Sequence, residues 1–159
     1  MKKLSIALAA SLALLAGCAS DGGGSSESAA TILQAGSHSG LKDQTEKDIH
    51  NQADLESMWN QIFANQSSTK PPLPVVDFTK TTVAVYGVGE MKTGGWTIRV
   101  DRAEPTTGGY AVGFTVNKPG NNCSRSGNEV TDPFIIITVP TALPITFDEV
   151  KSHQIPPCT

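Results

Sequence analysis

Histidine and serine side chains are the residues of this chain that could carry metal or nucleophilic chemistry. His38, His50 and His153 have no partner at metal-ligand spacing, so exposed histidines are the simpler interpretation. Ser124 and Ser126 lie in a polar stretch that lacks a nucleophile elbow, which favours a solvated loop. We therefore expect no catalytic residue, no metal site and no cofactor, and we expect that the protein is not an enzyme.

The carboxylates give no acid–base pair by sequence. The candidates among them are Asp77, Glu90, Asp101, Asp132, Asp148 and Glu149. Most lie near the ends of expected strands, where exposed acids are ordinary, and no two can be assigned as acid and base. Gly87-Val88-Gly89 begins like a dinucleotide-binding fingerprint, but the third glycine is absent and a strand follows where a helix is required. Neither pattern indicates a catalytic or cofactor site.

The N-terminus carries a more specific chemical signal. Two lysines precede a mostly apolar run over residues 4–16 that contains no charged residue, the layout of a secretory signal. As a helix this run would reach only about 20 Å, less than a hydrocarbon core of roughly 30 Å, so its removal is expected. Leu15-Ala16-Gly17-Cys18 resembles the lipobox of bacterial lipoproteins. The resemblance implies that Cys18 becomes the N-terminus, carries lipid and tethers the protein to a membrane; a secreted protein with a free thiol is the alternative.

The cysteine count follows from that assignment. With Cys18 lipidated, Cys123 and Cys158 remain in an oxidising envelope compartment, where disulfides persist. We expect them to bond to each other, which would stabilise the fold by about 3.8 kcal/mol in the loop-entropy model. Neither has the His or Cys neighbours that a metal-binding thiol needs. In such lipoproteins Ala19, in place of Asp, indicates an outer-membrane destination in cells that have one.

Length and composition predict a single domain on a flexible tether. The chain has 159 residues and a formal net charge of -3, with no basic cluster that would indicate nucleic-acid binding. Residues 1–17 are expected to be the signal peptide. Residues 18–29 are rich in glycine and serine and predict a flexible tether. Residues 30–159 are long enough for one domain with its own core.

Hydrophobic periodicity predicts the elements of this domain. Apolar residues recur at helical spacing over 51–63, where Asn51 can cap the first turn with Asp54 three residues later. The expected strands are 31–38 and 44–50, which are weak, then 81–91, 96–101, 110–117, 134–139 and 145–151. Of these, 81–91 should be central, and 96–101 with 110–117 should form a half-buried hairpin whose turn, 104–109, uses glycines for positive φ. The order predicts an α+β fold: a mainly antiparallel, sandwich-like sheet with one amphipathic helix packed on it.

A repeated local pattern marks a candidate binding loop. Thr93-Gly94-Gly95-Trp96 precedes one strand, and Thr107-Gly108-Gly109-Tyr110 precedes the next. Paired glycines before an aromatic residue suit hairpin geometry, with the aromatic ring in the core. A direct binding role for Thr93, Gly94, Gly95 and Trp96 is the second interpretation, and both stay open.

Several segments in order resemble one known family. They are Leu55-Glu56-Ser57-Met58-Trp59, Pro71-Pro72, Val76-Asp77-Phe78-Thr79-Lys80, Val83-Ala84-Val85-Tyr86-Gly87, Thr93-Gly94-Gly95-Trp96-Thr97-Ile98 and Asp132-Pro133-Phe134-Ile135. Together they resemble the C-terminal domain family of PrcB, a protease complex subunit, over roughly residues 49–140. The family usually has Tyr where this chain has Trp96, which keeps the ring and loses the hydroxyl.

That resemblance implies a non-catalytic accessory role at the cell envelope, stabilising or anchoring a partner such as a secreted protease. The candidate surfaces are an exposed sheet edge and the loop formed by Thr93, Gly94, Gly95 and Trp96. The alternative function is a small-ligand- or glycan-binding domain. That alternative needs a pocket lined by aromatic residues such as Trp96 and Tyr110.

Overall fold

The computed structural model describes residues 29–66, 70–120 and 129–157. Its elements are β1 (Thr31–Gly36), β2 (Thr45–Ile49), α1 (Gln52–Ile62), β3 (Thr82–Gly87), β4 (Thr97–Thr106), β5 (Gly109–Lys118), β6 (Phe134–Val139), β7 (Ile145–Phe147) and β8 (Lys151–Gln154). This is the expected α+β class, mostly antiparallel sheet with one helix. Within the described ranges, no helix has the length and apolar character needed to cross a membrane.

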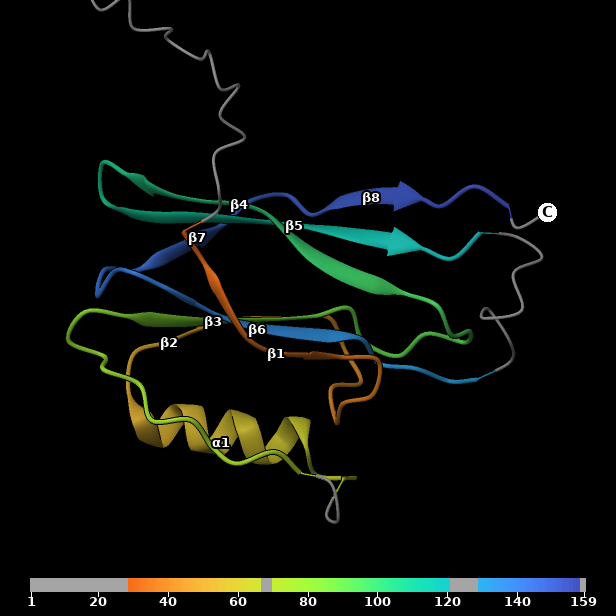
Figure 1. The fold of residues 1–159 in the computed structure, drawn as a ribbon, viewed down its shortest axis with the longest axis horizontal. Helices are drawn as coiled ribbons and strands as arrows, with labels where there is room; N and C mark the ends of the chain where they lie inside the picture. The colour runs from red at the N-terminus through yellow and green to blue at the C-terminus, as the bar shows by residue number, and fades with distance from the viewer. Residues whose placement is uncertain (1–28, 67–69, 121–128, 158–159) are drawn as a thin grey trace, which may run out of the picture.

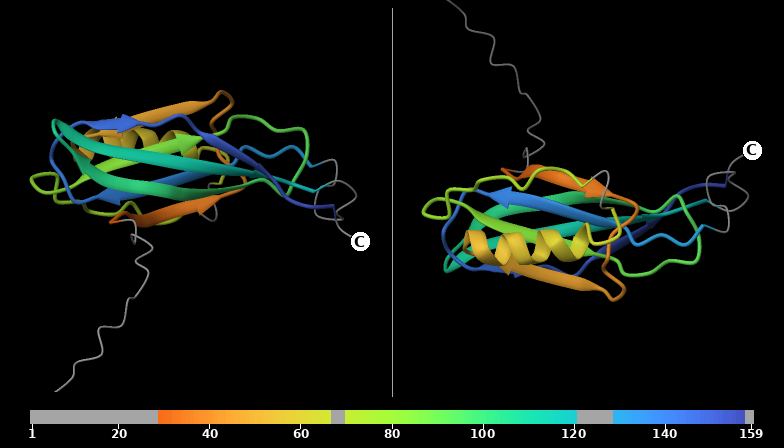
Figure 2. Two further views of the ribbon diagram at one scale, coloured as in Figure 1. Left: turned by 90° about the horizontal axis from the view of Figure 1, so that it is seen from above. Right: turned by 90° about the horizontal axis from the view of Figure 1, so that it is seen from below.

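The strands form two sheets that face each other, and α1 lies against the outer face of one of them (Figures 1 and 2). The first sheet has the strand order β1-β6-β3-β2, and every neighbouring pair in it is antiparallel. The second sheet pairs β4 with β5 as an antiparallel hairpin. On the other side of β5, β7 and then β8 pair with it in parallel.

The central strands of the first sheet are buried on both faces, as their nearly continuous apolar sequence predicts. On β3, Ala84 and Tyr86 pack in the core between the sheets, whereas Val83 and Val85 pack in a second core beneath α1. On β6, Ile135 and Ile137 pack in the core between the sheets, whereas Ile136 packs in the core beneath α1. The first sheet therefore contributes to two cores, one on each face. Burial of each such aliphatic side chain stabilises the fold by about 1.5–3 kcal/mol.

Helix α1 begins and packs as its sequence predicts. The Asn51 side chain accepts a hydrogen bond from the Asp54 backbone N–H at 2.8 Å, which caps the first turn. Leu55, Trp59 and Ile62 are its buried residues. The Trp59 indole N–H donates to the carbonyl of Pro71 at 3.0 Å, so the proline-rich segment after the helix crosses its face.

The hairpin and the C-terminal strands differ from the sequence-based expectation. Strands β4 and β5 extend to Thr106 and Gly109, so the turn is shorter than 104–109. Neither Gly108 nor Gly109 has positive φ; Gly109 is needed because a Cβ there would lie 2.3 Å from the Pro144 carbonyl oxygen. The single final strand expected over 145–151 is instead the pair β7 and β8, which are parallel to β5.

Strand β5 is also more buried than its alternating pattern predicts. Ala111 and Thr115 lie on the side away from the inter-sheet core, yet both are buried. Gly113, between them, is covered by two charged residues. A Cβ there would be 3.2 Å from Asp148 Oδ2 and 3.7 Å from Arg102 Cβ. Long charged side chains therefore cover the small residues on this face of β5.

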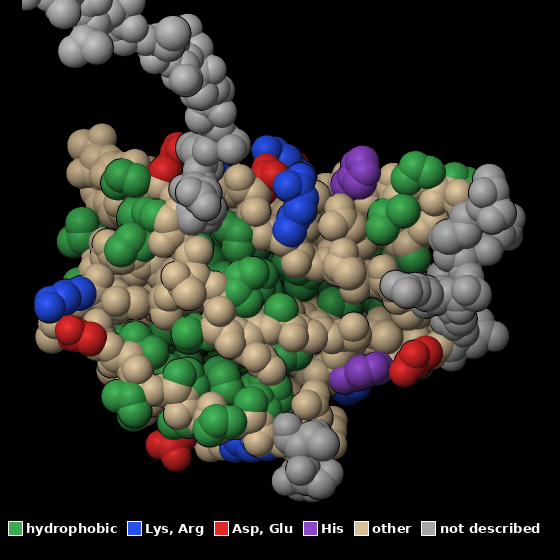
Figure 3. Space-filling view, in the orientation of Figure 1, with side chains coloured by type: hydrophobic (Ala, Val, Ile, Leu, Met, Phe, Trp, Pro, Cys, Tyr) green, Lys and Arg blue, Asp and Glu red, His purple; other side chains and the backbone are tan. Residues whose placement is uncertain are grey.

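Charged side chains are sparse on the face seen in Figure 3, and apolar side chains gather beside α1. Val75, in the proline-rich segment, is 94% exposed. Ile32, Val130 and Leu143 are also exposed. Single exposed apolar residues of this kind are common on soluble proteins and do not by themselves mark a site.

Candidate functional site

The loop predicted from the paired glycines is a tight, hydrogen-bonded turn before β4. Gly95 has φ of 85°, a conformation that favours glycine. The Trp96 indole N–H donates to Thr93 Oγ1 at 3.1 Å, and Thr131 Oγ1 donates to the Thr93 carbonyl at 2.9 Å. An isolated bridge between Met91 and Thr131 holds the start of the loop. The loop is thus built by turn geometry, and its binding role stays a prediction.

Trp96 is only partly buried because it lines a cleft of about 690 Å³. The cleft lies where β2 and β3 of the first sheet face the end of β5 and the β7–β8 segment of the second. Its lining is Gln44, Glu46, Tyr86, Val88, Met91, Trp96, Val116, Lys118, Phe147, Asp148, Glu149, Val150, Lys151 and Ser152. Val88, Trp96, Phe147 and Val150 pack against the inter-sheet core and remain half-buried. The cleft is therefore a place where that core is incompletely covered.

Tyr86 supplies a polar group to this apolar floor. The residue is 3% exposed, and its ring stacks on Phe114 with centroids 5.0 Å apart. Burial, and then the nearby carboxylate of Glu46, raise the pKa of the Tyr86 hydroxyl, which keeps it protonated. No hydrogen bond joins this hydroxyl to another described residue. It is a hydrogen-bond donor available to whatever occupies the cleft.

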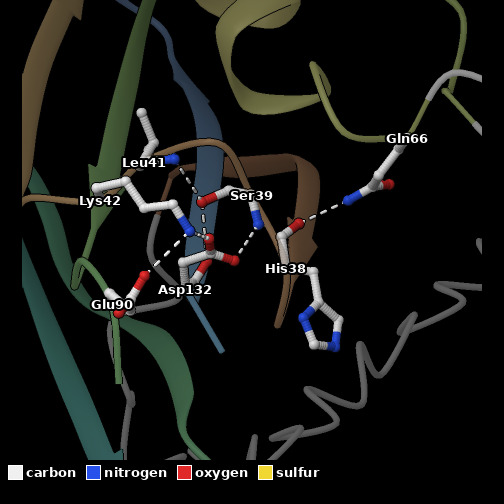
Figure 4. A network of polar contacts seen from close by, with 7 residues as sticks. All are labelled: His38, Ser39, Leu41, Lys42, Gln66, Glu90 and Asp132. Carbon is white, nitrogen blue, oxygen red and sulfur yellow. Dashed lines mark hydrogen bonds and ion pairs between the residues drawn. The ribbon is translucent and has the colours of Figure 1, made fainter. Parts of the chain in front are cut away.

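A polar cluster surrounds the carboxylate of Asp132, the residue after Thr131, which bonds to the loop (Figure 4). Asp132 is 6% exposed, contrary to the expectation that acids at strand ends are exposed. Its carboxylate accepts hydrogen bonds from the Ser39 backbone N–H at 2.5 Å and from Lys42 Nζ at 3.3 Å. Lys42 also pairs with Glu90 at 3.1 Å, and hydrogen bonds with Glu90 and then Asp132 raise the pKa of Lys42.

This cluster positions backbone and shows no catalytic arrangement. Ser39 Oγ donates to the Asp132 carbonyl at 2.9 Å and accepts from the Leu41 N–H at 3.2 Å, so a base does not face the hydroxyl. Glu90 N–H donates to the Lys42 carbonyl at 3.0 Å. The cluster joins the β1–β2 connection, the turn after β3 and the residues before β6. The turn after β3 and the residues before β6 in turn hold the loop that ends in Trp96.

The other residues singled out by sequence lie apart. Tyr110 is buried in the inter-sheet core and does not line the cleft, so only Trp96 of the two expected aromatics does. His38 lies 3.3 Å from Glu129, and His50 lies 3.0 Å from Asp48. In the described ranges no three His, Cys, Asp or Glu side chains could hold a metal ion. Cys18, Cys123 and Cys158, and nearly all of the tether, lie outside the described residues.

Sequence inspection missed the cleft because its floor looks like ordinary core. Tyr86 sits in a continuous apolar strand, and Phe147 and Val150 belong to a segment without a clear period. The one signal of a cleft was Glu46. It pairs with Tyr86 in the antiparallel register, so this charged side chain lies on the face of β2 that is turned toward the inter-sheet core.

Comparisons with known proteins bear on this same part of the chain. Searches of curated proteins and of solved structures found no match. A family model did match: residues 82–140, which run from β3 to the end of β6 and include the Trp96 loop and Asp132, are similar to the PrcB C-terminal family.

Proposed function

We propose that this protein is a non-catalytic accessory domain that binds a secreted protease complex at the cell envelope. The observation that carries the proposal is the match of residues 82–140 to the PrcB C-terminal family. The matched segment contributes Tyr86, Val88, Met91, Trp96 and Val116 to the cleft. An incompletely covered core at this place is the kind of surface that a protein partner covers.

Site-specific crosslinking in the native host tests this proposal. A photoreactive residue replaces Lys118 at the cleft, and in a control strain it replaces Glu56 on the exposed side of α1. We expect a secreted protease to crosslink from position 118 and not from position 56. Deleting the chain should lower the amount or activity of that protease. Crosslinks that contain no protease, in cells that secrete one, would overturn the proposal.

The membrane tether is the second part of the proposal. The sequence around Cys18 supports lipidation and supports an outer-membrane location if the host has such a membrane. Palmitate labelling should mark the wild-type chain, and Cys18→Ser should abolish the label and release the protein from the membrane fraction. A labelled Cys18→Ser chain would contradict the assignment.

The disulfide between Cys123 and Cys158 is proposed with support from the residues on either side. Lys118 pairs with Gln154, and the Ile155 N–H donates to the Lys118 carbonyl at 3.1 Å. A Cβ on Gly120 would lie 2.2 Å from the Pro156 carbonyl oxygen, so the two chain segments that lead to these cysteines run side by side. The intact mature chain should gain the mass of two hydrogens on reduction. Equal masses would show two free thiols.

A small-ligand or glycan site is the second candidate function. It is supported by the half-buried Trp96 ring in a cleft large enough for a small ligand. It loses the support expected from Tyr110, which is in the core. Binding of soluble oligosaccharides that is lost in Trp96→Ala, in a protein that crosslinks to no protease, would favour this candidate over the first.

A further inference from the structure

We infer that the cleft accepts an extended segment of a partner protein that carries a lysine or arginine beside an apolar residue. This inference rests on the proposed function, in that the partner is a protein. It names the chemistry of the partner segment, which the family match does not.

The apolar half of the inference comes from the floor of the cleft. Val88, Trp96 and Val150 are half-buried there although they pack against the fully buried inter-sheet core, and Met91, also half-buried, lines the same cleft. An apolar side chain that packs on them would remove their exposed apolar surface from water, which favours binding.

The charged half comes from ion pairing on the walls. Lys151 bonds to Asp101 at 2.6 Å, and Asp148 pairs with Arg102 at 3.1 Å, so these two lining residues are satisfied within the domain. Glu46 accepts only a long hydrogen bond from Gln44, at 3.5 Å, and Glu149 has no ion pair with a described residue. Two carboxylates therefore line the cleft without an ion pair to any cation in the described part of the chain.

These two carboxylates come from opposite walls. Glu46 belongs to β2 in the first sheet, and Glu149 lies between β7 and β8 in the second. Lys118, at the end of β5, is the one lining cation that has no ion pair with a described residue. The unpaired charge of the described lining is thus net negative, which favours a basic group in the partner.

The shape of a lysine or arginine side chain suits this combination. Its aliphatic stem can lie on the apolar floor while its charged head reaches a carboxylate. The face of the half-buried Trp96 ring attracts a cation as well. The Trp96 ring is held by its hydrogen bond to Thr93, and the Tyr86 hydroxyl can donate to a backbone carbonyl of the segment. Strand β2 is the last strand of the first sheet in the described part of the chain, so its outer edge, beside the cleft, offers backbone pairing to an extended chain.

The test uses the mature protein as purified from its host, in detergent micelles, and three short peptides. They are acetyl-Thr-Val-Thr-Arg-Val-Thr-Thr-amide and its variants with Gln or Glu in place of Arg. The indole N–H resonance of Trp96 reports occupancy of the cleft. That of Trp59, which is bonded to Pro71 beneath α1, is the internal control. We expect the Arg peptide to shift Trp96 and to bind more tightly than the Gln and Glu peptides.

Removing a carboxylate and removing a lysine from the cleft should change peptide binding in opposite directions, which makes the test specific. Glu46→Gln and Glu149→Gln should each weaken binding of the Arg peptide about twofold to fivefold, and Lys118→Gln should leave it equal or tighten it. Glu56→Gln, on the exposed side of α1, is the matched control and should have no effect. Equal binding of the three peptides, or equal weakening by Glu56→Gln, would overturn the inference.

The two proposals can fail separately. If a protease crosslinks from position 118 but the peptides show no charge preference, the accessory function stands and this inference falls. If the Arg peptide binds with the expected signs and no protease crosslinks, the site stands and the proposed partner class falls.

Discussion

Asp132 shows how one side chain can organise three chain segments. Its carboxylate is removed from water and accepts hydrogen bonds from the Ser39 N–H and from Lys42. A buried carboxylate is stable only when it is bonded in this way. If the carboxylate is deleted, the Ser39 N–H, which is itself buried, has no acceptor.

Asp132→Ala should therefore lower the free energy of unfolding by about 2–3 kcal/mol, the cost of leaving a buried donor without an acceptor and of creating a small void. Urea denaturation of the wild type, Asp132→Ala and Glu90→Gln would measure it. The Glu90 side chain pairs only with the exposed end of Lys42 in this cluster, and its backbone bond is unaffected by the substitution, so Glu90→Gln should cost less. Equal losses in both variants would contradict this account.

Gly108 and Gly109 form a matched pair at the hairpin turn. A Cβ on Gly109 would lie 2.3 Å from the Pro144 carbonyl oxygen, whereas a Cβ on Gly108 would meet no atom within 4 Å. The Pro144 carbonyl cannot simply move away, because it accepts the Tyr110 N–H at 3.1 Å. Gly109→Ala should destabilise the fold by about 1–3 kcal/mol through overpacking.

Gly108→Ala should stay within about 0.5 kcal/mol of the wild type, as open surface positions do. The two variants would be compared by thermal unfolding under one condition. If Gly108→Ala is the more destabilising of the two, the close approach of β5 to Pro144 is not what requires glycine at this turn.

At the scale of elements, the parallel strands β7 and β8 are held to β5 partly by charges outside the core. Lys151 of β8 bonds to Asp101 of β4 at 2.6 Å, and Asp148 before β8 pairs with Arg102 of β4. The hydrogen bond with Lys151 is the main cause that lowers the pKa of Asp101. Strand β8 is therefore linked to β4 across β5.

This link predicts a pH dependence. Because the folded pKa of Asp101 is below its unfolded value of about 3.9, its contribution to stability is fully present above that value. The contribution is lost as the pH falls through the lower, folded pKa. Asp101→Asn should lower stability at pH 7 and make the loss of stability below about pH 4 less steep than in the wild type. Denaturant unfolding at pH 7, 4 and 3 would measure both effects; an unchanged slope would contradict them.

Sequence alone predicts the elements whose pattern is local. Helix α1 has its cap and its apolar stripe within its own residues, and β3 and β6 are long apolar runs. The burial of Gly113 depends on Asp148, 35 residues further along the chain, and strand β8 is tied to β4 by the bond between Lys151 and Asp101, which are 50 residues apart, so no local pattern reveals them. The Trp96 loop could be located from its glycines, whereas the cleft beside it arises from the packing of two sheets.

At the scale of the whole molecule, the matched segment is smaller than the folding unit. Residues 82–140 contain β3 to β6 but exclude β1, β2, α1, β7 and β8. Val83, Val85 and Ile136 owe their burial to the core beneath α1, where Leu55 and Trp59 cover them. Without α1, this face of the first sheet would be an exposed apolar surface, and without β1 and β2 both β6 and β3 would become edge strands.

A chain cut to residues 82–140 should therefore fail to fold. We expect a broad, non-cooperative thermal transition and binding of a hydrophobic dye, because one of the two cores is missing. Residues 30–159 should unfold in a single cooperative transition, since β3 and β6 contribute side chains to both cores. Circular dichroism of the two chains at matched concentration would decide. Cooperative unfolding of the 82–140 chain alone would show that the matched segment is a folding unit by itself, and that α1 is an addition to it.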